Sequence, residues 1–178
     1  MSAETKKWIE NIVVGLNLCP FAGSVMNAGK VRYKMSKAEN HENLMQELLF
    51  EIDFLLAADP EEVETTFLIH PNILTDFPLY LDFIDMAEEL LEEGEMEDLV
   101  QIAGFHPDYT FDDTDYDDPA NYTNRSPYPM LHLLRGESLE AAIDAYGDTE
   151  SIPLRNIEVM RKLGLEKVQQ MREECFDN

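Results

Sequence analysis

Two histidines stand where an apolar run of the sequence meets a proline. Residues 67–71 read FLIHP and residues 104–107 read GFHP, which places His70 and His106 at the ends of two predicted strands. Parallel strands joined by a helix have their carboxyl ends at one edge of the sheet, where open α/β folds bind ligands. The two imidazoles could therefore share an acid, base or metal-binding function near neutral pH. The alternative is that each ring only caps a backbone carbonyl at the end of its strand.

A long polar segment, residues 106–127, follows the second of these histidines. A loop of this length inside a compact domain is usually functional or disordered, and its tyrosines favour an ordered structure. Asn121, Asn124 and Arg125 crowd hydrogen-bonding groups near its end. The guanidinium of Arg125 could hold the carboxylate or phosphate of a ligand. The alternative is a structural ion pair with one of three acids of the segment, Asp108, Asp117 or Asp118.

One cysteine and three histidines could form a metal site. Thiolate and imidazole groups are good ligands for zinc and iron, so either metal could be bound by Cys19, His70, His106 and His132. The alternative for a lone cysteine is a small buried hydrophobe, and for a histidine within a strand it is a satisfied core residue. The spacing of the four residues does not require a metal. The sequence also lacks the motifs of nucleotide-binding, serine-hydrolase and zinc-protease sites.

The apolar pattern predicts the elements that must position these side chains. Short apolar or alternating runs predict four strands, at residues 30–35, 65–70, 99–105 and 130–135. Apolar residues at helical spacing predict helices near residues 8–16, 44–56, 79–91, 139–146, 151–164 and 166–175, whereas residues 23–29 are expected to be a flexible connection. The alternation of strands and helices predicts right-handed crossovers and at least three parallel strands. We therefore expect a single α/β domain over residues 1–178, with a roughly four-stranded, mostly parallel or mixed sheet and covering helices.

The charge of the sequence excludes two classes of partner. Acidic side chains number 37 and basic ones 13, giving a net charge of -24, and no Lys or Arg occurs between Lys37 and Arg125. Such a surface repels nucleic acids and anionic membranes, so neither is expected as a partner. The N-terminal residues lack a signal-peptide core, no window is apolar enough to span a bilayer, and two cysteines make no disulfide framework. A cytoplasmic protein is therefore expected.

Three segments of the sequence resemble the signature of an uncharacterised proteobacterial family, the domain of unknown function fourteen-fifteen. They are GLNLCPFA at residues 15–22, QIAGFHPDY at residues 101–109 and DDPANYTNRSPYPMLHLLR at residues 117–135. The resemblance covers nearly the whole chain, with one small departure, since the family usually has Ser where this chain has Ala103 and Gly104. It implies that eight residues occupy signature positions: Cys19, His106, Asp108, Asn121, Asn124, Arg125, His132 and Arg135. It implies no reaction.

These residues support an enzyme as the first functional hypothesis. His106 would be the general acid/base or a metal ligand, oriented by Asp108, and His70 or His132 would supply a second imidazole. Arg125 and Arg135 would hold the anionic group of a small substrate, together with Asn121 and Asn124. The helix that begins after Arg135 would add N-terminal amides, which favour an anion.

Two further hypotheses involve no catalysis. The polar segment could recognise a small ligand or a partner protein in a binding module, which would be stabilised by its ligand without turning it over. It could also be structural and hold the fold together through an internal hydrogen-bond network.

Overall fold

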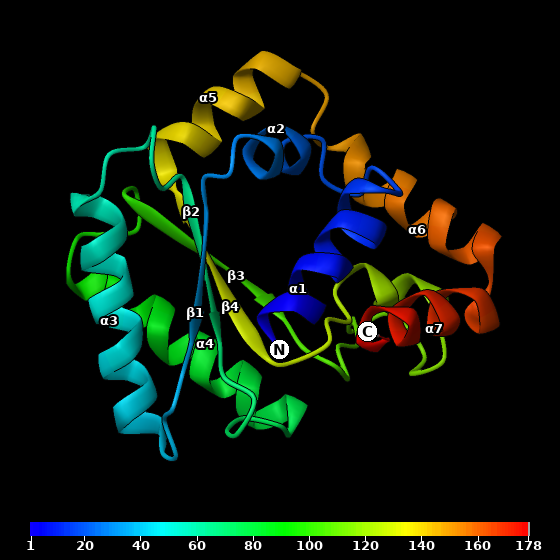
Figure 1. The fold of residues 1–178 in the computed structure, drawn as a ribbon, viewed down its shortest axis with the longest axis horizontal. Coiled ribbons are helices and arrows are strands. Elements are labelled where there is room, and N and C mark those ends of the chain that lie inside the picture. Colours follow the sequence, from blue (N-terminus) through cyan, green and yellow to red (C-terminus); the bar gives the residue numbers. More distant parts are fainter. Residues whose placement is uncertain (178) are drawn as a thin grey trace.

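The sheet has four strands, and their order determines which strand ends meet. In the computed structural model, which describes residues 1–177, the strands are β1 (Val31–Met35), β2 (Thr65–Ile69), β3 (Val100–Phe105) and β4 (Met130–Arg135), in the order β1-β2-β4-β3 (Figure 1). β1 and β2 are parallel, and β4 is antiparallel to both β2 and β3. The predicted α/β fold with a mixed sheet is confirmed. Asn178, the last residue of the predicted domain, lies outside the described residues.

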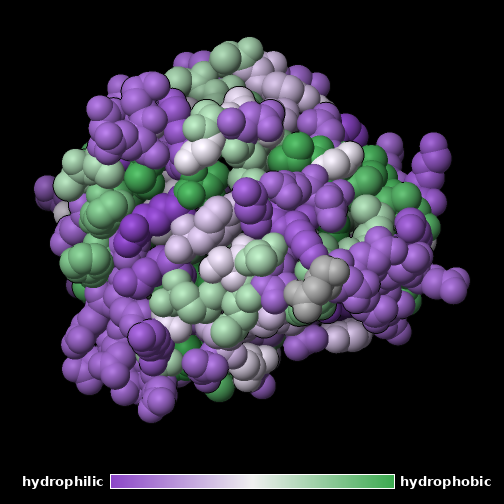
Figure 2. All heavy atoms as spheres, viewed as in Figure 1, coloured by the Kyte–Doolittle hydropathy of each residue, from purple (hydrophilic) through white to green (hydrophobic). Residues whose placement is uncertain are grey.

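Helices cover both faces of this sheet. α3 (His41–Ala57) and α4 (Phe77–Glu93) lie on one face, and most of the other helices lie on the opposite side (Figure 1). These others are α1 (Ser2–Trp8), the π-helix η1 (Ile9–Val14), α2 (Ala22–Asn27), the 3₁₀ helix η2 (Pro119–Thr123), α5 (Gly136–Tyr146), α6 (Ser151–Leu163), α7 (Leu165–Glu173) and the 3₁₀ helix η3 (Glu174–Phe176). Among residues 1–177, no helix is both long and apolar enough to cross a membrane. Hydrophilic side chains cover most of the face seen in Figure 2, as the net charge predicts.

Alternating side chains of β4 separate two hydrophobic cores. Successive residues of a strand point to opposite faces of the sheet. Leu131 and Leu133 therefore pack into the core under α3 and α4, whereas Met130 packs into the core on the other face. Trp8 anchors α1 to this second face, because its ring meets that of Phe105 edge to face at 5.1 Å. His132 lies on this second face too, which separates it from the core under α4.

A buried carboxylate fixes the edge strand β1 to α3. Glu51 is completely buried and accepts hydrogen bonds from two nitrogens of Arg32, at 2.7 and 3.2 Å. The ammonium of Lys34 lies 3.5 Å from the same carboxylate. Two of the few basic residues of this acidic chain therefore neutralise one charge that the core could not hold alone.

The N-terminal helix changes pitch close to its end. α1 continues directly as η1, after which the N–H of Gly15 donates to the carbonyl of Glu10 at 3.0 Å. A side chain at position 15 would collide with the backbone, because a Cβ atom there would lie 2.3 Å from the carbonyl oxygen of Asn11. Glycine therefore permits this pitch. π-Helical segments are rare and often occur at functional sites, and Ile9 and Val13 of η1 line an internal cavity.

One sequence expectation about the backbone was wrong. Residues 23–29 were expected to be a flexible connection, but Ala22–Asn27 forms the short helix α2. The hydroxyl of Ser24 donates to the carbonyl of Phe21 at 2.9 Å in its first turn. The chain then leaves the helix through Gly29, whose φ of 71° favours glycine. Of the two glycines that suggested flexibility, Gly23 lies within α2 and Gly29 follows its end.

Candidate functional site

His70 and His106 lie at the same edge of the sheet, as the sequence predicts. The last residues of β2 and β3 both pair with Met130, so the two histidines follow at neighbouring positions. The ring of Tyr80 from α4 lies 5.9 Å from the ring of His70 and 5.0 Å from that of His106. Both histidines are completely buried.

Both ring nitrogens of His106 are occupied by the backbone. Nδ1 accepts a hydrogen bond from the N–H of Asp108 at 3.0 Å, so Nε2 carries the proton and donates it to the carbonyl of Leu74 at 3.0 Å. Burial lowers the pKa of His106, which keeps the ring neutral. Leu74 itself has a φ of 56°, a left-handed conformation that is strained for leucine. The ring therefore joins the end of β3 to the loop before α4 and has no free nitrogen for a substrate.

His70 uses one nitrogen and leaves the other bare. Nδ1 lies 3.0 Å from the carbonyl of Ile73, to which it can only donate, so Nε2 carries no proton. Nε2 is buried and has no hydrogen-bond partner among residues 1–177. Burial lowers the pKa of His70 to about 4, because a charged ring would be desolvated there.

Asn121 organises the polar segment, because its amide oxygen accepts two hydrogen bonds and its amide nitrogen donates two. Its Oδ1 accepts from the N–H of Phe111 at 3.1 Å and from the hydroxyl of Thr114 at 2.7 Å. Its Nδ2 donates to the carbonyls of Asp115 and Tyr116 at 2.9 and 3.2 Å. The segment is therefore ordered, and the amide predicted to bind a ligand is engaged within the protein.

Arg125 is buried among carbonyls and aromatic rings. Its Nε donates to the carbonyl of Tyr109 at 2.9 Å, and one terminal nitrogen donates to the carbonyl of Tyr116 at 2.7 Å. The guanidinium also lies 4.3 Å from the ring centre of Tyr116 and 4.9 Å from that of Tyr122, at distances typical of cation–π contacts. Only 3% of this residue is exposed, so its charge is held by dipoles and π electrons.

The structural ion pair weighed for Arg125 does not form. Among residues 1–177, none of the three acids Asp108, Asp117 and Asp118 makes a salt bridge to it. Asp118 instead binds Arg161 of α6 at 2.6 Å. The physical reason is the rigid local backbone, which turns two carbonyls toward the guanidinium before any carboxylate can reach it.

Asp108 lies beside a second arginine that the sequence analysis missed. Its backbone, and not its carboxylate, contacts the ring of His106, and its carboxylate accepts a hydrogen bond from Tyr116 at 2.9 Å. Arg172 of α7 donates from Nε to the carbonyl of Ser126 at 3.0 Å. Burial, and to a smaller extent the nearby charge of Arg125, lower the pKa of Arg172. Two guanidiniums therefore lie near each other at this edge.

Asn124 and Arg135 serve different parts of the sheet. Asn124 donates from Nδ2 to the carbonyl of Gly104 at 3.3 Å, which fixes the polar segment to β3. Arg135 lies at the far end of β4 and donates to the carbonyls of Val63 and Ala58 at 2.9 and 2.8 Å. The structure therefore does not bring Arg135 together with Arg125, because β4 runs away from the histidine edge.

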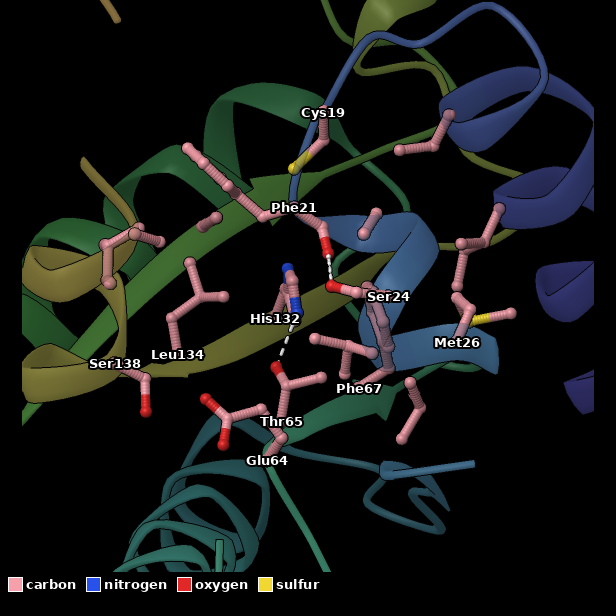
Figure 3. Close-up of a pocket in the computed structure, with 18 of the residues that line it drawn as sticks. Cys19, Phe21, Ser24, Met26, Glu64, Thr65, Phe67, His132, Leu134 and Ser138 are labelled. Carbon is pink, nitrogen blue, oxygen red and sulfur yellow. Dashed lines mark hydrogen bonds between the residues drawn. The ribbon is translucent and has the colours of Figure 1, made fainter. Parts of the chain in front are cut away.

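A cavity of about 420 Å³ lies on the other face of the sheet (Figure 3). Its walls come from the sheet, from α1 with η1, from the segment of Cys19 with α2, and from α5. Most of the walls are apolar, and the polar side chains among the lining residues are Cys19, Ser24, Glu64, Thr65, His132, Arg135 and Ser138. This is a volume that suits a small organic molecule.

His132 lies in the middle of this cavity. Its ring stacks on Phe67 at 3.9 Å with an angle of 9° between the planes. Its Nε2 lies 2.6 Å from the hydroxyl of Thr65 (Figure 3). Burial lowers the pKa of His132 to about 3, so the ring is neutral at physiological pH. Unlike His106, it is only partly enclosed and is accessible from the cavity.

The four predicted metal ligands do not meet. Cys19 and His132 line the cavity, whereas His70 and His106 pack against Tyr80 in the core on the opposite face. Among residues 1–177, no three His, Cys, Asp or Glu side chains lie close enough together to hold a metal ion. The expectation of a shared site failed because β4 turns His132 to the face that the strand ends do not use.

The sequence analysis also missed most of the cavity. Phe21, Glu64, Thr65 and Ser138 were not singled out, since apolar and small polar residues in helices and strands look like ordinary core and surface. One signal was present in the segment GLNLCPFA, because its Cys19 and the three residues that follow all line the cavity.

Together these features define a small α/β protein with an apolar cavity on one face of a mixed sheet and a saturated polar network at one edge. The chain belongs to the family described as "Protein of unknown function (DUF1415)", which matches residues 1–170. No curated protein and no solved structure matches it.

Proposed function

We propose that this protein binds a small, largely apolar molecule in the cavity around His132. The observation that carries the proposal is an apolar chamber of about 420 Å³ with one neutral imidazole in its middle. Ligand pockets are typically apolar, with a few polar groups that orient the ligand. A cavity of this size in a domain of 178 residues is large for a packing defect, because protein interiors are close-packed.

The saturation of the sheet edge supports the same choice. The polar side-chain atoms of His106 and Asn121 already form hydrogen bonds within the protein, so a ligand there would first have to break these bonds. In the cavity, no such bond has to be broken at Nδ1 of His132, which makes no hydrogen bond among residues 1–177. We therefore centre the hypothesis of a binding module on the cavity and no longer on the polar segment.

Octanol is a suitable neutral probe of this proposal. Trp8 is the only tryptophan and lines the cavity, so its fluorescence should change in a saturable way when octanol binds. Ala142 of α5 also lines the cavity, and Ala142→Phe should fill part of it and weaken octanol binding. Ala145→Phe on the exposed side of the same helix is the matched control and should bind octanol like the unmodified protein. Equal binding by both variants would refute the cavity as the site.

We propose, second, an anion site at the sheet edge, as an enzyme acting on an anionic substrate would need. The observation that favours it is a pair of guanidiniums, of Arg125 and Arg172, that bond to carbonyls of residues 109–126 and make no salt bridge among residues 1–177. Calorimetric titration with inorganic phosphate tests it. Arg172→Gln should remove phosphate binding, and Lys167→Gln on the same helix should not. Absence of phosphate binding to the unmodified protein would remove this proposal.

The state of the two cysteines supports a proposal about the cellular compartment of the protein. Cys19 and Cys175 are both free thiols. We therefore place the protein in a reducing compartment such as the cytoplasm.

A further inference from the structure

We propose that the ligand of the cavity is an apolar amine, whose ammonium group donates to the carboxylate of Glu64. This inference rests on the proposed binding function and adds the chemical class of the ligand. Its basis is the carboxylate of Glu64, a charged acceptor at the cavity wall that makes no hydrogen bond or salt bridge among residues 1–177 of this strongly acidic chain.

The direction at His132 follows from Thr65. The hydroxyl of Thr65 has one hydrogen, and it donates that hydrogen to the carbonyl of Leu133 at 2.6 Å. In its contact with His132, Thr65 must therefore accept, so Nε2 of His132 carries the ring proton. Nδ1 is left as a bare acceptor. In Figure 3 it points away from Thr65 into the cavity.

The second free acceptor is the carboxylate of Glu64. This residue lines the cavity and is half-buried, and its side chain makes no hydrogen bond or salt bridge among residues 1–177. Figure 3 shows the carboxylate next to Thr65, on the side of the cavity where Ser138 lies. A ligand that reaches it with an ammonium group would make a charge-assisted hydrogen bond in a partly desolvated place.

Two donor side chains at the cavity wall are occupied, whereas Nε1 of Trp8, which also lines the cavity, has no hydrogen-bond partner among residues 1–177. Arg135 directs Nε and one terminal nitrogen to the carbonyls of Val63 and Ala58. The hydroxyl of Ser24 donates to the carbonyl of Phe21 at 2.9 Å. A carboxylate ligand would face the negative charge of Glu64.

The charge of the chain and of the imidazole favours the same class of ligand. A net charge of -24 attracts cations to the surface and repels anions. His132 stays uncharged near neutral pH, because burial lowers its pKa to about 3, so it does not repel an ammonium group.

Three octyl compounds separate this inference from the proposed function. Octylamine, octanol and octanoate share one apolar chain and differ in the charge and hydrogen-bond donors of the head group. By Trp8 fluorescence and calorimetry at neutral pH, octylamine should bind at least about tenfold more tightly than octanol, as expected for a charge-assisted hydrogen bond. Octanoate should bind most weakly of the three.

Each other pattern of binding has its own meaning. If no octyl compound binds, the cavity proposal itself is overturned. If octylamine and octanol bind equally, the binding function stands and the amine inference fails. If octanoate binds most tightly, the amine inference also fails and Arg135 becomes the anchor of the head group.

Substitution of the acceptor provides the control. Glu64→Gln keeps the shape of the side chain and removes its charge, so the preference for octylamine over octanol should disappear while octanol still binds. Glu62→Gln removes an exposed charge two residues away and should keep the full preference. If both variants lose the preference equally, the effect comes from overall charge, and Glu64 is not the anchor.

Discussion

His106 is completely buried after β3 and His132 is partly buried within β4, and the two differ in what their ring nitrogens can still do. His106 has both nitrogens bonded to backbone groups, whereas His132 has one bonded to Thr65 and one open to a cavity. Burial lowers the pKa of each ring, so the protonation state does not separate them. The comparison teaches that two histidines of one sheet can differ in the hydrogen-bonding capacity that they leave open to a ligand.

The largest test of this comparison is the loss of Arg125 from the saturated edge. Arg125→Met keeps much of the volume but leaves the buried carbonyls of Tyr109 and Tyr116 without their donor. Each hydrogen bond to a charged group contributes about 1.5 to 3 kcal/mol, so the free energy of unfolding should fall by about 3 to 5 kcal/mol. Urea unfolding followed by circular dichroism measures it.

A matched variant shows whether this loss belongs to the buried network. Arg161→Met removes the exposed ion pair to Asp118 and should lower the stability much less. Octanol binding by folded Arg125→Met should remain close to that of the unmodified protein, because Arg125 does not line the cavity. Equal destabilisation by the two variants would contradict a structural role specific to Arg125.

The edge was only partly predictable from the sequence. The FLIHP and GFHP patterns correctly indicated that His70 and His106 end neighbouring strands, since proline stops a strand whatever follows. The pattern MLHLLR predicts a strand but does not say which face of the sheet His132 occupies, and the face is what separates His132 from the other two histidines. The acceptors of Arg125 are backbone carbonyls, which every residue has and no motif displays.

The cavity could not have been predicted in the same way. Its walls come from five or more separate segments whose apolar residues are indistinguishable in sequence from a packed core. The pitch of η1, which presents Ile9 and Val13 to the cavity, depends on backbone hydrogen bonds. One sign of this helical pitch in the sequence is Gly15. The steric reason for a glycine at this position exists only in the folded state.

The second test uses acid to sharpen the comparison at His70. The pKa of His70 is lowered from 6.5 to about 4, so the unfolded chain binds a proton before the folded protein does. The contribution of neutral His70 to the free energy of unfolding is complete above pH 6.5 and is lost progressively as the pH falls toward 4. One unit of pKa corresponds to about 1.4 kcal/mol, so the loss from this residue should be about 3 kcal/mol.

Urea unfolding at a series of pH values between these limits measures the loss. His70→Gln should have a lower stability near neutrality and a flatter dependence on pH, because a glutamine cannot take up the proton. A variant that stays as acid-sensitive as the unmodified protein would assign the effect to other groups, among them His132.

The smallest expected effect concerns access to the two thiols. Cys175 is completely buried and its thiol contacts the carbonyl of Met171, whereas Cys19 is partly exposed and lines the cavity. Burial also raises the pKa of Cys175, which disfavours the reactive thiolate. Iodoacetamide should therefore label Cys19 first, as mass spectrometry of digested protein can show.

Octanol should slow this labelling several-fold by filling the cavity, and Cys19→Ala should leave only slow labelling at Cys175. If octanol leaves the rate at Cys19 unchanged while Trp8 still reports binding, the probe occupies another part of the cavity, and the contrast between the closed edge and the open face would have to be drawn around His132 alone.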